Sequence, residues 1–324
     1  MKTYNLLILL ILISLLSCDA PRENPFDPQS PNYFKEEPDR VMSKIMVKHL
    51  YPPFNPISNV QIIEPNLHLF GVTNAKGEIT FEHLPADSLT LIAMAERYFP
   101  DTLTFAKTAN NEYEIFLNAK PQIDDFQLKS FYNNIYTELS ITSLYFSAFV
   151  TDLDGPFDIS VTLHNPEFNF DTVLVRDINN SNLFTIEFNL QDISKKLTPE
   201  EVPELNFNLI VKNMNNDLVS TDFYSIKRVI AVNLKQLSPT TSQVMRDSVV
   251  FKWVDPELPY GYSFNIVLLT LPTFKEIAYK GIPKGETSFV VKNLSPGQYN
   301  WKLQVEDKLG NICQSNYINF YYEQ

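Results

Sequence analysis

Three aspartates around one glycine form the cluster in this sequence that is best suited to binding a metal ion. Asp152, Asp154 and Asp158 surround Gly155, and the Gly155-Pro156 pair places them in a loop between two apolar runs. Carboxylate oxygens are ligands that Ca²⁺ prefers, but Ca²⁺ takes about six to eight oxygens and this loop offers three side chains. We therefore expect a solvated acidic turn and no specific metal site, with Ca²⁺ binding by the loop as the alternative.

The rest of the sequence lacks the common motifs of catalytic, zinc and nucleotide sites. It contains no Gly-x-Ser-x-Gly, no His-Glu-x-x-His and no Gly-x-Gly-x-x-Gly. The segment 281–287 has the glycines of a phosphate loop, but its spacing is one residue short and Glu286 stands where lysine is needed, so a hairpin turn is expected there. The histidines are single and scattered, unlike a metal site: His49, His68, His83 and His164. We expect no catalytic residue, cofactor or bound metal.

Composition favours a β-rich protein with several hydrophobic cores. The chain has 324 residues, with 24 Phe and 16 Tyr but only 8 Gly, a balance that suits strands with packed faces. This length suits two or three domains of about 100 residues. The formal net charge of −12 repels nucleic acid, so no nucleic-acid partner is expected. The predicted fold class is all-β.

The first eighteen residues determine where the chain is expected to work. Lys2 is followed by an unbroken apolar run, Leu6–Ile13, and then by Leu15-Leu16-Ser17-Cys18. The run is far shorter than the ~20 apolar residues of a membrane-spanning helix. A charged start, a short apolar region and a small residue before cysteine resemble a bacterial lipoprotein signal. An ordinary signal peptide or an uncleaved anchor is the alternative.

The resemblance implies that residues 1–17 are removed and that the thiol of Cys18 receives a diacylglycerol with fatty acids such as palmitate. Cys18 would then anchor the chain to the cell envelope, and we favour the outer membrane over the inner. The Pro-rich residues 18–42 cannot bury a core and are expected to form an extended tether. Cys313 then has no second cysteine to pair with, so we expect no disulfide. We expect its thiol to be buried or to lie at a strand edge, with no base beside it.

Residues 43–120 have the pattern of a first β-domain. The segment Thr73–Pro85 has a polar turn with a glycine, followed by a strand of period two, which predicts a β-hairpin. Together with Ile57–Ile62 and Tyr98, it resembles the carboxypeptidase regulatory-like domain, a small transthyretin-like β-sandwich. The resemblance implies an accessory domain without catalytic residues. Arg97 stands where that family often has glycine, which leaves the geometry of this turn open.

Residues 121–232 are also rich in strands and are similar to bacterial Ig-like modules. The apolar run 143–150 leads through the acidic turn into a second strand, residues 205–211 alternate strictly, and residues 225–230 are expected to form the last strand. Thr198-Pro199-Glu200-Glu201 is a capping box with proline at the first helical position. It predicts one short helical turn, which Pro203 ends.

Residues 233–324 have the clearest pattern of the three regions. Val249, Phe251 and Trp253 lie on one face of a predicted strand, and Tyr299, Trp301, Leu303 and Val305 on one face of another that follows a Leu-x-Pro-Gly turn. This arrangement resembles the fibronectin type III module, with residues 307–311 as the turn of its last hairpin. Strict alternation places both tryptophans in the core, whereas a sugar-stacking role would require exposed rings.

Two classes of function follow from this organisation of three tandem β-sandwiches, transthyretin-like, Ig-like and fibronectin type III-like, on a lipid anchor. The favoured class is a non-enzymatic envelope lipoprotein that acts as scaffold, adhesion or assembly factor through contacts with an envelope protein. The alternative is a glycan- or nutrient-binding surface lipoprotein associated with an outer-membrane importer. The glycan partner needs an exposed aromatic platform, for which the candidates are Tyr260, Tyr262, Tyr321 and Tyr322.

Overall fold

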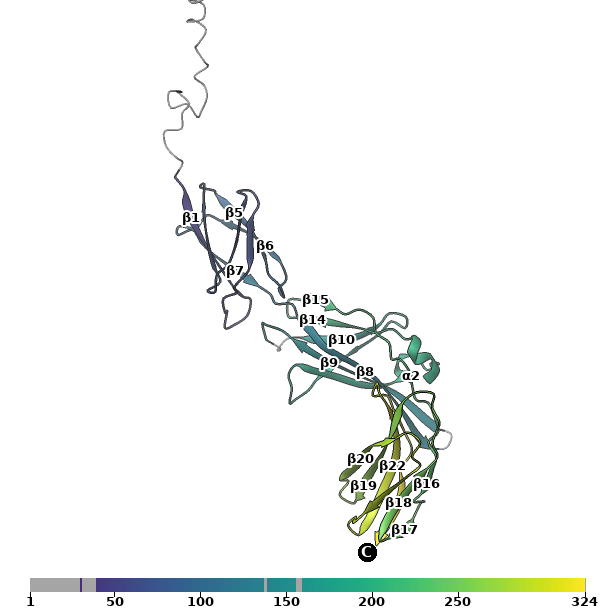
Figure 1. Ribbon diagram of the computed structural model, residues 1–324. Coiled ribbons are helices and arrows are strands. Elements are labelled where there is room, and N and C mark those ends of the chain that lie inside the picture. Colours follow the sequence, from purple (N-terminus) through teal and green to yellow (C-terminus); the bar gives the residue numbers. More distant parts are fainter. Residues whose placement is uncertain (1–29, 31–38, 137–138, 156–158, 324) are drawn as a thin grey trace, which may run out of the picture. The chain divides into compact units, whose positions relative to one another are not determined.

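The computed structural model describes residues 30, 39–136, 139–155 and 159–323, and over these ranges the protein is all-β (Figure 1). The chain divides into two compact units, Met1–Asn118 and Ala119–Gln324. The helices of the described ranges are two short segments, α2 (Leu190–Ile193) and η1 (Pro199–Glu204). Neither they nor any other helix in these ranges has the length and hydrophobicity needed to cross a membrane. Cys18 lies outside the described residues.

The first unit is a sandwich of two sheets. One sheet has the order β4-β1-β7, in which β1 is antiparallel to β4 and parallel to β7, and the other has the order β3-β2-β5-β6. Its inward-facing apolar residues, such as Val47, Ile62 and Ile115, are fully buried between the sheets. The strands are β1 (Val41–His49), β2 (Gln61–Glu64), β3 (Leu69–Val72), β4 (Glu78–His83), β5 (Ser88–Met94), β6 (Asp101–Ala106) and β7 (Glu112–Leu117).

The prediction of a hairpin over Thr73–Pro85 is wrong, because the two flanking strands do not pair with each other: β3 pairs with β2, and β4 pairs with β1. The turn carries the chain from one sheet to the other. The Thr73 hydroxyl holds this crossing, since it donates to the carbonyl of Ile57 at 2.9 Å and accepts from the N–H of Val60 at 3.0 Å. Gly77 has φ +71°, as the pattern predicted, and a Cβ there would lie 2.6 Å from the carbonyl oxygen of Val47.

Arg97 adopts the left-handed conformation that a glycine would take at its position, with φ +67°. The following residue, Tyr98, is buried, and its ring meets that of His49 edge-on with 5.6 Å between centroids. Arg97 therefore has a glycine-like backbone in this turn and adds the strain of a side chain in that conformation.

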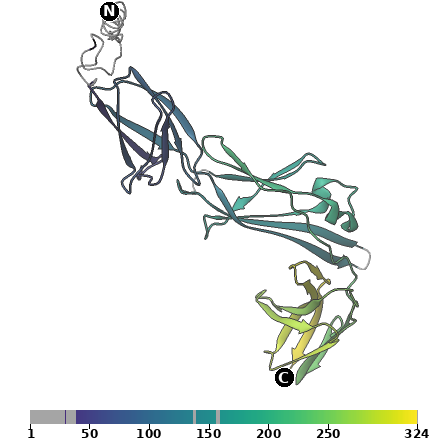
Figure 2. The same cartoon turned by 45° about the horizontal axis from the view of Figure 1, so that its top comes forward.

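The second unit begins with the sandwich formed by β8 to β15. β8 and β9 form a long hairpin (Figure 2), and β13 and β12 continue the same sheet. The facing sheet has the order β11-β10-β14-β15. The strands are β8 (Gln122–Tyr136), β9 (Leu139–Thr151), β10 (Ser160–Asn165), β11 (Phe170–Val173), β12 (Val175–Arg176), β13 (Leu183–Asn189), β14 (Asn208–Lys212) and β15 (Leu218–Ser220).

The remaining strands form the second sandwich of this unit. One sheet has the order β16-β18-β21, and β20-β19-β22 with β23, β24 and β17 forms the other. The strands are β16 (Gln236–Ser238), β17 (Gln243–Arg246), β18 (Ser248–Trp253), β19 (Tyr262–Leu271), β20 (Glu276–Pro283), β21 (Ser288–Lys292), β22 (Gly297–Asp307), β23 (Ile312–Gln314) and β24 (Ile318–Glu323).

Each sandwich of the second unit has its own core. Phe146 of β9 packs on Phe207 at 4.9 Å between ring centroids in the first core, and Phe251 packs on Trp301 at 5.0 Å in the second. Trp253 is 1% exposed and Trp301 0%, which confirms their predicted core positions. Tyr299, Leu303 and Val305 are buried as the alternation predicted.

The connections agree with the sequence predictions only in part. The capping box of η1 is present, with the Thr198 N–H donating to Glu201 Oε2 at 2.7 Å, but Pro203 lies inside the helix instead of ending it. The hairpin predicted at 281–287 is wrong, because β20 and β21 lie in different sheets. Residues 225–230 do not form the predicted strand.

We expect Trp301→Ala to destabilise the second unit by about 3–5 kcal/mol, because it removes a buried ring and leaves a cavity. It also leaves the Pro239 carbonyl without the indole N–H that donates to it at 3.0 Å. Urea denaturation of the variant should show this loss.

The matched control is Tyr321→Ala, which changes an aromatic residue that is 40% exposed and should shift stability by at most about 0.5 kcal/mol. A Trp301→Ala protein that melts within about a degree or two of the wild type, while binding of a sugar disappears, would contradict the core assignment.

Candidate functional site

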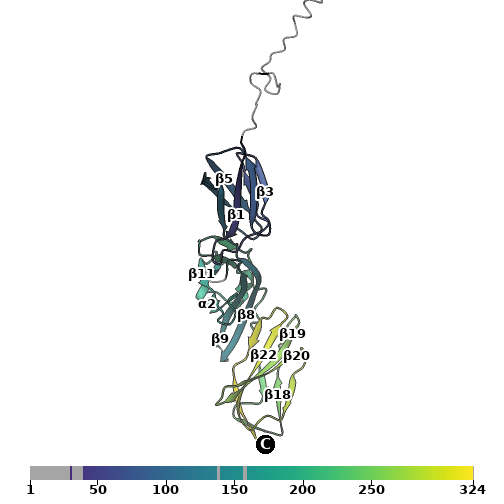
Figure 3. The same ribbon diagram turned by 90° about the vertical axis from the view of Figure 1, so that its left-hand side faces the viewer.

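The second unit contains a junction at which the sheets of its two sandwiches become one. β8 pairs with β9 along most of its length, and at Phe131–Asn133 its other edge pairs with β23 in parallel. The result is one sheet, here called the large sheet, with the order β12-β13-β9-β8-β23-β22-β19-β20 and with β24 and β17 beside it. Figure 3 shows β8 and β9 together with β19, β20 and β22 of this sheet.

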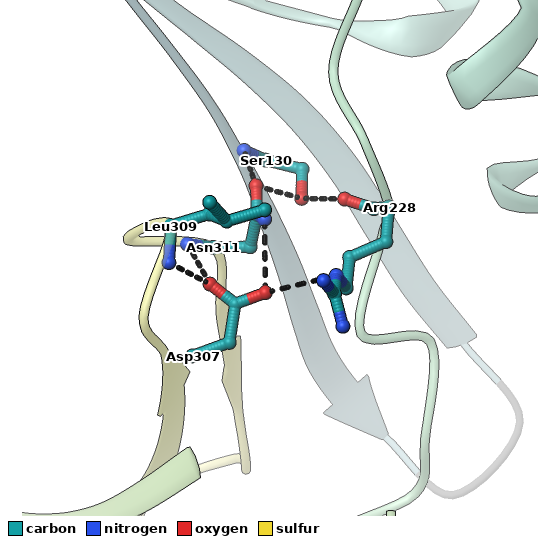
Figure 4. Close-up of polar contacts among 5 residues, drawn as sticks. All are labelled: Ser130, Arg228, Asp307, Leu309 and Asn311. Atoms are coloured by element: carbon teal, nitrogen blue, oxygen red, sulfur yellow. Dashed lines mark hydrogen bonds and ion pairs between the residues drawn. The ribbon is translucent and has the colours of Figure 1, made fainter. Parts of the chain in front are cut away.

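Asn311 is the centre of the junction (Figure 4). Its side-chain oxygen accepts hydrogen bonds from both the N–H and the hydroxyl of Ser130, each at 3.0 Å. Its backbone N–H and its amide group donate to the carboxylate of Asp307 at 3.0 and 3.1 Å. Asn311 is 1% exposed and Ser130 0%, so water does not compete for these bonds.

Arg228 connects the linker between the sandwiches to the same network. Its Nε lies 3.4 Å from Asp307 Oδ2, the separation of an ion pair rather than of a directed hydrogen bond. Its carbonyl accepts from the Ser130 hydroxyl at 3.1 Å, and its guanidinium lies 4.2 Å from the centroid of the Tyr260 ring. These contacts hold the segment that the sequence predicted as a strand.

A second group of contacts lies further along β8, at Asn134. The amide of Asn134 donates to the carbonyls of Val232 and Gln314 at 3.0 and 3.1 Å. The thiol of Cys313 donates to the Val232 carbonyl at 3.2 Å. Burial raises the pKa of the Cys313 thiol to about 12, so it stays protonated and acts as a donor, in agreement with the predicted buried thiol.

The acidic turn has a structural role at the start of this unit. Asp154 Oδ2 accepts from the backbone N–H of Ala119 at 2.6 Å, and Asp152 Oδ1 accepts from the N–H of Asp154 at 2.9 Å. Asp158, the third aspartate of this turn, lies outside the described residues. Among the residues that are described, no three His, Cys, Asp or Glu side chains are grouped as a metal site would require.

The four histidines lie apart and have local roles. His83 Nε2 lies 2.8 Å from the Ser43 hydroxyl, and His164 Nδ1 lies 2.6 Å from Asp171. His49 contacts Tyr98, and His68 has φ +54° in the turn between β2 and β3. None of these contacts joins two of the four histidines.

The four tyrosines that were candidates for an exposed aromatic platform do not form one. Tyr262 and Tyr322 are core residues, 7% and 4% exposed, because they lie on the inward face of their strands. Tyr260 lies under Arg228. Only Tyr321 of the four candidates has a substantially exposed side chain, and a single ring is not a platform.

The structure places Tyr262 in a polar cluster that sequence reasoning missed. Burial and a hydrogen bond to Asp255 raise the pKa of the Tyr262 hydroxyl above its ordinary value. Burial opposes the charge of Asp255, but donation from Tyr262 and from the N–H groups of Glu257 and Gly285 outweighs it and lowers the pKa of that carboxyl. The cluster ties two loops 30 positions apart, which no local sequence signal indicates.

We expect Asn311→Ala to lower the stability of the second unit by about 1–3 kcal/mol, chiefly because the buried Ser130 N–H loses its acceptor. Calorimetry should show a lower midpoint and a separation of the unfolding of the two sandwiches. Asn316→Ala, at an exposed asparagine in the following loop, is the matched control. Equal midpoints for the two variants would contradict the importance of the network.

We expect millimolar Ca²⁺ to shift the melting midpoint of chelator-treated protein no more than Mg²⁺ does, because the carboxylates of Asp152 and Asp154 already accept backbone hydrogen bonds. Thermal melts with each ion make the comparison. A calcium-selective rise of several degrees that Asp154→Ala abolishes would mean that the turn is a metal site.

The chain matches no protein-family model and no curated protein. Among solved structures, it is similar to the crystal structure of the FN1-FN3 domains of chicken CNTN1, with 10% sequence identity and a TM-score of 0.34. The alignment covers 89% of this chain and 97% of that chain.

Proposed function

We propose that this protein is a non-enzymatic lipoprotein of the cell envelope, anchored through Cys18, whose folded part is a scaffold for protein–protein contacts. The observation that carries the proposal is the large sheet, which joins two sandwiches through a parallel strand pair and a buried hydrogen-bond network. Tandem domains on a short linker move independently unless their interface is large or well bonded. A fused pair holds its surfaces in one arrangement, which is what a scaffold requires.

The anchoring part of the proposal is supported by the sequence before the first strand. The apolar run and Leu15-Leu16-Ser17-Cys18 resemble a lipoprotein signal, and the Pro-rich residues 18–42 suit a tether between lipid and protein. We place the anchor in the outer membrane. The first unit, with its resemblance to the carboxypeptidase regulatory-like domain, serves as an accessory domain between the tether and the fused sandwiches.

The glycan-binding alternative has less support. It needs several exposed aromatic rings on one surface, and both tryptophans, Tyr262 and Tyr322 are buried in the core of the last sandwich. The most buried polar side chains at the junction, Ser130 and Asn311, bond to one another and are at most 1% exposed, so they are not accessible to a sugar.

Replacing Cys18 with Ala should move the protein from the membrane fraction to the soluble fraction and abolish incorporation of labelled palmitate. A diacyl anchor holds through burial of its CH₂ groups at ~0.8 kcal/mol each, so without it the affinity for the membrane is lost. Cys313→Ala is the control, because it removes the other cysteine, which is buried and therefore not a lipid acceptor. Recovery of the Cys18→Ala protein in the membrane at the wild-type level would overturn the anchor.

Crosslinking in intact cells tests the scaffold part with the same two variants. We expect adducts with envelope proteins for the wild type and for Cys313→Ala, and fewer for Cys18→Ala. Binding of the full chain to a glycan array that Tyr321→Ala abolishes would instead favour the glycan-binding alternative, since Tyr321 is the most exposed of the tyrosine candidates.

A further inference from the structure

A groove runs along the part of β8 that precedes its contact with β23. Its walls, here called the edge groove, are residues 126–129 of β8, residues 225–227 of the linker between the sandwiches, and Leu309 and Asn311 of the β22–β23 turn. It therefore lies directly beside the junction, on the same edge of β8. Its volume of about 260 Å³ is below the ~300–1,000 Å³ of small-molecule sites.

The backbone of β8 presents unpaired hydrogen-bonding groups to this groove. The Ser130 N–H points away from β9, because it donates to Asn311. In a strand, N–H and C=O groups of alternate residues point to the same side, so those of Leu128 and Phe126 point the same way as those of Ser130. The orientation of β9 is consistent with this, because the N–H of Val150 points away from β8 and donates to the carbonyl of Asn182.

These groups have no ladder partner in the part of the chain that the structure describes. β8 pairs with β23 only at residues 131–133, and the opposite wall, Ser225–Lys227, does not form a strand. No backbone hydrogen bond joins residues 126–128 to that wall. The edge groove thus lies between an unpaired strand edge and an irregular segment.

The floor of the groove is apolar. Phe126 packs on Phe146 at 6.4 Å and on Tyr224 at 5.0 Å between ring centroids, and Leu128 packs against the same core. Ile226, on the other wall, is 1% exposed. A side chain that entered the gap would therefore meet the edge of the hydrophobic core of this sandwich.

The rim of the groove is positively charged, in contrast to the chain as a whole at −12. Lys129 and Lys227 flank it, and among the described residues neither amine is paired with a carboxylate. A second copy of this acidic chain would be repelled overall, whereas a segment with acidic side chains would be attracted to the rim.

We propose that the edge groove binds an extended acidic segment of a partner protein, which adds to the large sheet as a strand beside β8. Its backbone pairs with Phe126 and Leu128, as β23 pairs with the next residues of β8. An apolar side chain of the segment packs between Leu128 and Ile226, and flanking carboxylates pair with Lys129 and Lys227. The inference rests on the proposed function, because it gives the scaffold one site for its protein contacts.

The test is hydrogen–deuterium exchange of the full chain in detergent, with a capped peptide of alternating Asp and Val as the probe. We expect the peptide to slow exchange in residues 125–130 and 224–228. Two matched peptides should have no effect: one with Lys in place of Asp, and one with N-methylated residues on the edge that would face β8, which cannot donate.

Charge variants complete the test. Lys129→Glu with Lys227→Glu should weaken binding of the acidic peptide by on the order of tenfold, which is a difference of about 1.4 kcal/mol. Lys280→Glu with Lys292→Glu, at exposed lysines of β20 and β21, should leave it unchanged.

Three results would overturn the inference: slow exchange of residues 126–128 before any peptide is added, equal protection by the acidic and basic peptides, or no protection by millimolar acidic peptide. A chain that is membrane-bound through Cys18 but shows no protection loses this inference alone. A chain that shows protection but is soluble loses only the anchor.

Discussion

The arrangement of the second unit depends on one hydrogen-bonding requirement, the need of the β8 edge for partners after Lys129. A strand that extends beyond its own sandwich exposes unpaired N–H and C=O groups, each costly to bury. Here β23 pairs with the backbone of residues 131–133. Ser130 lies just before this parallel pairing begins, and the side-chain oxygen of Asn311 accepts the hydrogen bond of its N–H. Asn311 in turn is positioned by Asp307. The junction is therefore a consequence of completing one strand edge.

The alternation of apolar residues allowed much of this fold to be predicted, and it failed where pairing partners mattered. Period two identifies which face of a strand is buried, so Trp253 and Trp301 were placed correctly. It does not identify which strand lies alongside. The turns at Thr73–Pro85 and 281–287 have good hairpin residues, yet both carry the chain between sheets, because a sandwich needs crossings as well as hairpins.

The junction could not be predicted from the sequence, for a physical reason. Ser130 and Asn311 are 181 positions apart and are of types that elsewhere occupy solvated turns. Their importance comes from burial, which the sequence does not reveal for short polar side chains. The tyrosine candidates show the converse: Tyr262 and Tyr322 are candidates for an exposed platform by sequence, but both lie within strands and are buried.

Burial of the Cys313 thiol affects how this chain would respond to an oxidising compartment. Attack on a disulfide or reaction with an oxidant requires thiolate, and burial holds the pKa of the Cys313 thiol far above neutral pH, so the thiol stays protonated. If Cys18 is acylated, Cys313 is the one cysteine that could crosslink two copies in an oxidising compartment. Because the junction buries the Cys313 sulfur, the folded protein is protected from oxidation at this cysteine and from disulfide-linked dimerisation.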